Sequence, residues 1–212
     1  MNATGATDAL IRAGRRLGAR GLISAGEGNL SLRLDADRIL VTPTGRRKDE
    51  LEPDDLVVVW LGHPDRDAVS RSGLRPTSDL AIHLAVYAAR PDVAAVAHAH
   101  LPAAMALTLA GEIPDPAGLP ETAHFLPRLP FLTLGVPGSA ELAGRVATAL
   151  TEPPEPLANA VLLERHGAVA VGEAPAAAVD RLELVEVLCR TWRDALLIRA
   201  ARIATSTELL PD

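Results

Sequence analysis

The 212-residue sequence is poor in cysteine and in long apolar runs, and each scarcity excludes a class of protein. Its single cysteine, Cys189, cannot form a disulfide within the chain, which is typical of a reducing compartment. No apolar run reaches the ~18 residues that a membrane-spanning helix needs, and the first residues lack a signal-peptide pattern. We therefore expect a cytoplasmic protein without a membrane partner.

The sequence also lacks an excess of positive charge and contains few aromatic residues. The net charge is −6 at pH 7, whereas a nucleic-acid backbone requires a basic face, so no nucleic-acid partner is expected. Aromatic residues make up 2% of the chain, which leaves few candidates for a catalytic tyrosine or tryptophan. Apolar residues make up 48%, enough for a substantial core, and the length suits one domain over residues 1–212.

Apolar periodicity predicts helices that alternate with short strands. The helices are expected at about 7–20, 77–90, 102–109, 138–150 and 175–203, and the strands at about 29–33, 38–42, 56–61, 93–96, 131–134, 160–163 and 168–171. Thr77 or Ser78 is the expected cap of the second helix. Residues 111–130, with five prolines, are expected to be a long irregular loop of the kind that is usually functional. The pattern indicates an α/β fold in which helices sandwich a sheet.

The most informative stretch is Ala97-His98-Ala99-His100, directly after the predicted strand at 93–96. Side chains two residues apart point to one face of a strand, so His98 and His100 should emerge together. Histidine is the commonest metal ligand, and catalytic Zn²⁺ typically has about three protein ligands. His166, between two apolar strands, is a candidate third ligand. The structural alternatives are histidines bonded to backbone at a strand end and, for His166, a turn histidine.

Asp79, at the start of the second predicted helix, could join these histidines. It could serve as a fourth ligand or as a general base beside the ion. The alternative is a carboxylate in the first turn of a helix, where the helix dipole favours negative charge.

Three short segments suit an anion, because each pairs a hydroxyl or amide side chain with an accessible backbone N–H. They are Gly28-Asn29, Thr44-Gly45 and Thr77-Ser78. The last lies at a predicted helix N-terminus, where phosphate binds readily. Ordinary turn and cap chemistry is the alternative for all three. The basic run at 46–48 is expected to be a solvated turn, although it could reach a substrate anion across a subunit boundary.

Taken in order, these motifs resemble the class II aldolase/adducin family. They are Gly-Asn-x-Ser-x-Arg, Thr-Pro-Thr-Gly, Arg-Pro-Thr-Ser-Asp with a histidine four residues on, His-x-His and Arg-His-Gly, and the similarity extends over about residues 6–199. The resemblance implies a single-domain α/β/α sandwich with a mainly antiparallel central sheet, and a homotetramer with active sites between neighbouring subunits. It implies Zn²⁺, or another divalent ion such as Mn²⁺ or Co²⁺, on His98, His100 and His166. It also implies that the phosphate of a sugar-phosphate substrate binds at Gly28, Asn29, Thr44, Gly45, Thr77 and Ser78.

Members such as L-fuculose-1-phosphate aldolase suggest the reaction. Zn²⁺ chelated by the hydroxyl and carbonyl oxygens of a ketose 1-phosphate polarises the carbonyl and stabilises an enediolate. Cleavage of a carbon–carbon bond then releases an aldehyde and dihydroxyacetone phosphate, while the carboxylate of Asp79 moves protons. An aldolase of this kind is the leading expectation.

Three features depart from the aldolase pattern. Aldolases of the family usually carry glutamate at the position of Asp79, whereas ribulose-phosphate 4-epimerases carry aspartate as a metal ligand. The tyrosine acids of the aldolase are missing, since Tyr87, the one tyrosine, lies in an apolar helical stripe and is expected in the core. Glu27 occupies a place where small hydroxyl residues are frequent in the phosphate loop; it would repel a phosphate unless it faces solvent.

The irregular stretch supplies another candidate, Glu121. It lies at about the distance past His-x-His at which dehydratases of methylthioribulose 1-phosphate place an acid/base glutamate, so we expect Glu121 to be the second acid/base group. The alternative is an exposed loop glutamate. A dehydratase, an epimerase and a decarboxylase of a 3-oxo sugar acid phosphate therefore remain open beside the aldolase. An adducin-like interaction module without catalysis is the alternative of another class.

Overall fold

The computed structural model of the chain describes residues 3–63, 68 and 70–208, and its seven strands form one sheet. The order across the sheet is β3-β2-β1-β4-β7-β6-β5. Neighbouring strands run antiparallel except for β5 and β6, which are parallel, so the predicted mainly antiparallel sheet is confirmed. The strands are β1 (Asn29–Arg33), β2 (Arg38–Val41), β3 (Val57–Trp60), β4 (Ala95–Ala99), β5 (Phe131–Leu132), β6 (Ala160–Leu163) and β7 (Gly167–Gly172).

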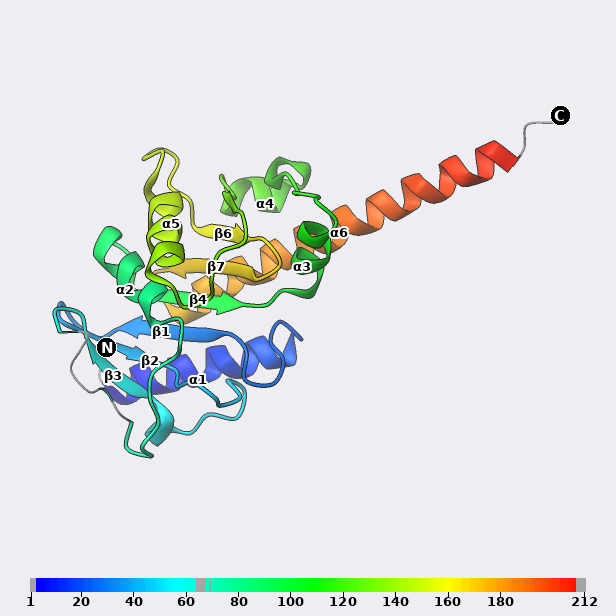
Figure 1. Cartoon of the computed structure of the whole chain (residues 1–212). Helices are drawn as coiled ribbons and strands as arrows, with labels where there is room; N and C mark the ends of the chain where they lie inside the picture. The colour runs from blue at the N-terminus through cyan, green and yellow to red at the C-terminus, as the bar shows by residue number, and fades with distance from the viewer. Residues whose placement is uncertain (1–2, 64–67, 69, 209–212) are drawn as a thin grey trace.

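Helices cover both faces of this sheet (Figure 1). One face shares an apolar cluster with α1 (Ala3–Ala19), α3 (Pro102–Leu109) and α6 (Pro175–Glu208). The other face is covered by α2 (Leu80–Ala89) and α5 (Ala140–Thr151), which also pack on each other. The predicted α/β/α sandwich is therefore confirmed. The C-terminal part of α6 extends beyond the body of the sandwich (Figure 1).

Small and branched side chains alternate along the central strands, and this alternation decides which helices pack on each face of the sheet. The alanines of β4 and β7 lie in the cluster with α6, whereas Val96, Val169 and Val171 lie in the cluster with α2 and α5. Small side chains let the axis of α6 approach the middle of the sheet closely, while branched side chains fill the wider space on the other side. His98 follows Val96 by two residues and so points to the face that α2 covers.

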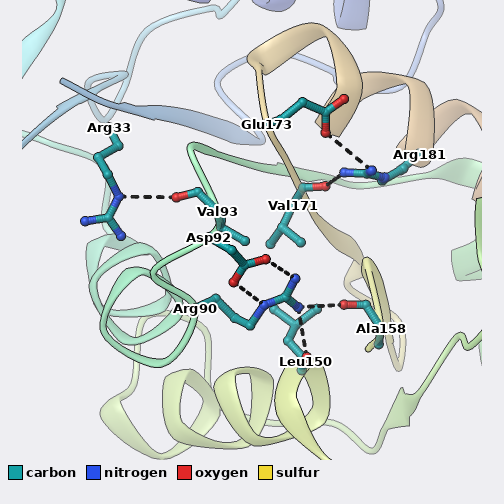
Figure 2. A network of polar contacts seen from close by, with 9 residues as sticks. All are labelled: Arg33, Arg90, Asp92, Val93, Leu150, Ala158, Val171, Glu173 and Arg181. Atoms are coloured by element: carbon teal, nitrogen blue, oxygen red, sulfur yellow. Dashed lines mark hydrogen bonds and ion pairs between the residues drawn. The ribbon is translucent and has the colours of Figure 1, made fainter. Parts of the chain in front are cut away.

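Three arginines, Arg33, Arg90 and Arg181, donate hydrogen bonds to backbone carbonyl groups (Figure 2). Arg90 is buried and donates to both carboxylate oxygens of Asp92, at 2.8 and 2.7 Å. Its Nη1 also donates to the carbonyl oxygens of Leu150 and Ala158, at 3.0 and 3.1 Å. One guanidinium thus joins the end of α2 to the end of α5 and to the segment before β6.

Two local expectations are wrong. The stretch 111–130 is not irregular throughout, because it contains a 3₁₀ turn (Pro116–Gly118) and α4 (Pro120–Phe125); prolines at the first positions start both. Elsewhere, between β2 and β3, another 3₁₀ turn spans Pro53–Asp55. Helix α2 begins at Leu80 with Asp79 at the N-cap position, so neither Thr77 nor Ser78 caps it.

No helix within the described ranges combines the length and apolar character needed to cross a membrane.

Candidate metal and anion site

The three predicted histidines meet at one end of the sheet. His98 lies on β4, His100 follows that strand, and His166 precedes β7. Strands β4 and β7 pair with Ala99 opposite Ala168, which brings the turn carrying His166 beside the end of β4. The three ring centroids are 4.8 to 5.0 Å apart, and one nitrogen from each ring lies within 4.8 Å of the others.

Gly167 makes this approach of the two strands feasible. Its φ is +85°, and a Cβ atom there would overlap the carbonyl oxygen of Ala99 and crowd His100. A glycine is therefore required at position 167, where β7 begins directly after His166.

The donor set fits a divalent metal ion. Nδ1 of His98 is 3.0 Å from the carbonyl oxygen of Ala168, so Nδ1–H donates there and Nε2 keeps its lone pair. That Nε2 is fully buried and has no hydrogen-bond partner among the described residues. Burial, helped by the charges of His166 and His100, lowers the pKa of His98 to about 3, and burial also lowers the pKa of His166. His98 and His166 are thus neutral at pH 7, as metal ligation requires.

Glu27 supports His100 instead of facing away from the site. Its Oε1 lies 3.4 Å from Nδ1 of His100, and its Oε2 accepts the backbone N–H of Ser24 at 3.2 Å. A carboxylate behind a ligating imidazole fixes the tautomer and the ring orientation. Glu27 is thus partly exposed to solvent, as one of the two sequence alternatives had it, but its carboxylate also lies against the ring of His100.

Asp79 is buried beside the histidines. It occupies the N-cap position of α2 without making a side-chain cap hydrogen bond, and its Oδ2 instead accepts Nδ2–H of Asn29 at 2.9 Å. It is not part of the histidine group whose nitrogen atoms converge. This arrangement suits a base beside a ligand set more than a fourth ligand.

The predicted anion residues line the same cleft, which has a volume of about 290 Å³. Two histidines and the carboxylate of Asp79 form one part of its wall. The predicted anion residues in the wall are Gly28, Asn29, Thr44, Thr77 and Ser78. Gly45 follows Thr44 in an exposed turn and is not a lining residue. The structure thus brings five of the six predicted anion residues together with His100, His166 and Asp79.

Comparison with known proteins agrees with this geometry. The model of the class II aldolase and adducin N-terminal domain matches residues 8–193. The chain belongs to this family. Among solved structures, this family member resembles L-fuculose-1-phosphate aldolase from Thermus thermophilus, with a TM-score of 0.75 and 31% identity over 92% of this chain and 95% of the other.

Three curated relatives of this family member have different activities. It is 35% identical to methylthioribulose-1-phosphate dehydratase of Acidiphilium cryptum, over 84% of this chain and 85% of the relative. It is 32% identical to 3-oxo-tetronate 4-phosphate decarboxylase of Haemophilus influenzae, over 94% of this chain and 92% of the relative. It is 31% identical to 5-methylthioribulose-1-phosphate/5-deoxyribulose-1-phosphate aldolase of Rhodospirillum rubrum, over 94% of this chain and 86% of the relative. The chain is accordingly an enzyme-type member of a sugar-phosphate family.

Behind the site of this family member lies a chain of hydrogen bonds that the sequence reasoning missed. Oδ1 of Asn29 lies 2.7 Å from Nε2 of His83, and Nδ1 of His83 lies 2.7 Å from Oγ of Ser31. Ser31 in turn contacts the hydroxyl of Tyr87 at 2.9 Å. The prediction that Tyr87 lies in the core is confirmed, since only 3% of it is exposed.

Asp79 sets the direction of these hydrogen bonds. An ionised carboxylate only accepts, so the amide nitrogen of Asn29 faces Asp79 and its Oδ1 accepts Nε2–H of His83. Nδ1 of His83 then accepts the hydroxyl proton of Ser31. Burial lowers the pKa of His83 to about 4 and so keeps this ring neutral.

Spacing could have revealed these residues. Asn29 and Ser31 are two apart on a strand, and Asp79, His83 and Tyr87 are four apart on a helix, so each set lies on one face.

Lys48 was also missed as a site residue. The basic run at 46–48 was expected to be a solvated turn, and Arg46 and Arg47 are exposed. Lys48, however, is only 1% exposed and lines the cleft.

Glu121 lies elsewhere within the chain. It belongs to α4 and lines a separate hollow of about 530 Å³ with residues of α6, such as Arg181 and Leu184. The histidines are not among the residues of that hollow. Within one copy, the structure therefore does not bring Glu121 to the other predicted site residues.

Proposed function

We propose that the chain is a metal-dependent lyase of a small ketose 1-phosphate, and that it eliminates water from a substrate like methylthioribulose 1-phosphate. The observation that supports this most is the convergence of three metal-competent imidazoles beside Asp79, in a cleft whose other wall carries neutral donors for an anion. An adducin-like interaction module has no need for such a set, which argues against the non-catalytic alternative.

His98, His100 and His166 would hold the ion, with Zn²⁺ the best match to three imidazoles. The bound ion would supply Lewis-acid polarisation of the substrate ketone. Ala168 and Glu27 hold the Nδ1 sides of His98 and His100, so Nε2 of each ring would be left for an ion without reorientation of the ring.

Asp79 is the proposed base. Its Oδ2 is held by Asn29, so Oδ1 takes the proton from C3 of the substrate, next to the C2 ketone. The electron pair of the broken C–H bond forms a double bond between C2 and C3, and the oxygen of C2 carries the negative charge of an enediolate. Departure of the C4 hydroxyl as water, with a proton from a second acid, leaves an enol that rearranges to a 2,3-diketone. The balance is the loss of one water molecule.

The tyrosine of the chain favours elimination over aldol cleavage. Cleavage in the fuculose-phosphate manner would use tyrosine acids, but Tyr87 is buried and bonded to Ser31 behind the site. We therefore place aldol cleavage, the leading expectation from the sequence, second. The relatives include a dehydratase, a decarboxylase and an aldolase, so the order rests on the position of Tyr87 and not on the relatives.

Glu121 remains our candidate for the second acid. Since it lies apart from the histidines within one copy, its use requires a neighbouring copy, as in the expected homotetramer with active sites between subunits. Glu121→Gln should lower kcat at least about 100-fold, the lower end of the usual range for loss of a general acid. Glu173→Gln, in the same hollow, is the control and should leave turnover unchanged. Unchanged turnover in Glu121→Gln would remove Glu121 from the mechanism.

The deciding experiment incubates the Zn²⁺-loaded protein with methylthioribulose 1-phosphate and a panel of other ketose 1-phosphates, followed by NMR of the products. A diketone that forms with wild type and not with His98→Ala supports the dehydratase. Dihydroxyacetone phosphate with an aldehyde would establish the aldolase instead. Absence of turnover, with metal bound, would show that the substrate class is wrong.

A further inference from the structure

Lys48 is the only lysine of the sequence, whereas the other 20 strongly basic residues are arginine. It follows two exposed arginines in the same turn, yet 1% of it is exposed. Lysine is almost never fully buried unless its charge has partners. A chain that otherwise uses arginine for its cations thus places its one lysine inside the cleft.

The ammonium group of Lys48 joins two loops. Its Nζ donates to the carbonyl oxygen of Gly26 and to that of Arg46, both at 2.6 Å. Gly26 belongs to the loop that leads into Gly28 and Asn29, and Arg46 ends the turn that contains Thr44. Two of the three donors of the ammonium therefore fix the relative position of two predicted anion-binding segments.

The cleft otherwise lacks a strong base. Its lining residues with acidic side chains are Glu27 and Asp79, and the other titratable lining residues besides Lys48 are His100 and His166. Lys48 is the one lysine or arginine among the residues that line this cleft. A phosphate group bound beside the two carboxylates needs a compensating positive charge, since like charges at close range repel strongly in a partly buried site.

The compact ammonium suits this position better than a guanidinium. Arginine is planar and carries five donors in a rigid fork, which would need more room than the space between two carbonyl oxygens. Burial lowers the pKa of Lys48 to about 8, and the charge of Asp79 opposes part of that effect. The ammonium form therefore predominates at pH 7.

We propose that Lys48 is the cation of the anion subsite, where its ammonium group ties the two lining loops together and supplies the positive charge for the substrate phosphate. This inference rests on the proposed function, since it assigns the charge partner of the sugar phosphate. Lys48 acts as a positioning and specificity residue and has no part in breaking bonds.

A first test uses the uniqueness of this lysine, because ¹³C-labelled lysine gives one side-chain Cε signal. Its shift is followed against pH with and without saturating inorganic phosphate. We expect a midpoint near pH 8 without phosphate, and an upward move of at least about one unit with it, because a bound dianion favours the ammonium form. A midpoint that stays in place while phosphate binds would overturn the proposal.

A second test compares three variants by calorimetric titration with inorganic phosphate. Lys48→Met should weaken binding at least about 10-fold, Lys48→Arg should fall between it and wild type, and the control Arg47→Met should bind within about twofold of wild type. With methylthioribulose 1-phosphate, Lys48→Met should raise KM more than it lowers kcat.

The outcomes separate this proposal from the proposed function. Equal phosphate affinity in Lys48→Met and wild type would overturn the role of Lys48 alone. Failure of wild type to bind phosphate would overturn both the anion subsite and the proposed function. If Lys48→Met does not fold, the wild-type lysine signal still decides.

Discussion

Replacing His83 by glutamine should remove a defined part of the acid sensitivity of the protein. Burial lowers the pKa of His83 from 6.5 to about 4. The unfolded chain takes up the proton near pH 6.5 while the folded protein does not, so stability from this residue is present above pH 6.5 and is lost as the pH falls to about 4. A shift of this size corresponds to roughly 3 kcal/mol in full, of which about 2 kcal/mol is lost between pH 7 and pH 5.

The assay is urea unfolding of wild type and His83→Gln at pH 7, 6 and 5. Glutamine carries an N–H that can still donate to Oδ1 of Asn29, so the hydrogen bonds of the site are largely kept. Other titrating groups, including His98, are common to both proteins and cancel in the difference. Wild type should lose about 2 kcal/mol more than the variant between pH 7 and pH 5. A difference that does not change with pH would refute the buried, neutral His83.

Two further predictions concern the metal and the fold. His98→Ala should lower bound zinc, measured by plasma mass spectrometry, from one equivalent per chain to a small fraction, because it removes the buried Nε2; full retention would contradict the ligand set. Arg90→Met should lower the free energy of unfolding by about 3 to 5 kcal/mol, because it leaves two carbonyl oxygens without their donor. Asp92→Asn should cost no more than about 1 kcal/mol, since this carboxylate is more than half exposed.

The sequence was most informative where the periodicity of one strand or helix decides which way its side chains point. Alternation along a strand predicts that His98 and His100 emerge together, and the sandwich follows from helices that alternate with strands. The place of His166 could not be derived in the same way. It depends on the pairing of β4 with β7, which are far apart in the sequence and whose register no local pattern specifies.

Residues in loops were harder to place for a related reason. The burial of Lys48 depends on two loops, before β1 and after β2, closing around one ammonium. Nothing in the residues next to Lys48 indicates that closure, so the run at 46–48 reads as an ordinary solvated turn. Its one distinguishing sign was compositional, the single lysine among so many arginines.

The register between β1 and β4 explains why the proposed base and the proposed metal ligands share one end of the sheet. Asn29 lies opposite His98, and Ser31 lies opposite Val96, so both polar residues of β1 face α2. Asn29 then reaches Asp79 and His83 on that helix. A slip of one residue would turn Asn29 to the opposite face and leave Asp79 without its donor. The hydrogen bonds from Tyr87 to Asp79 therefore hold the register of β1 as well as the carboxylate, and the geometry of the proposed site and that of the sheet are specified by the same contacts.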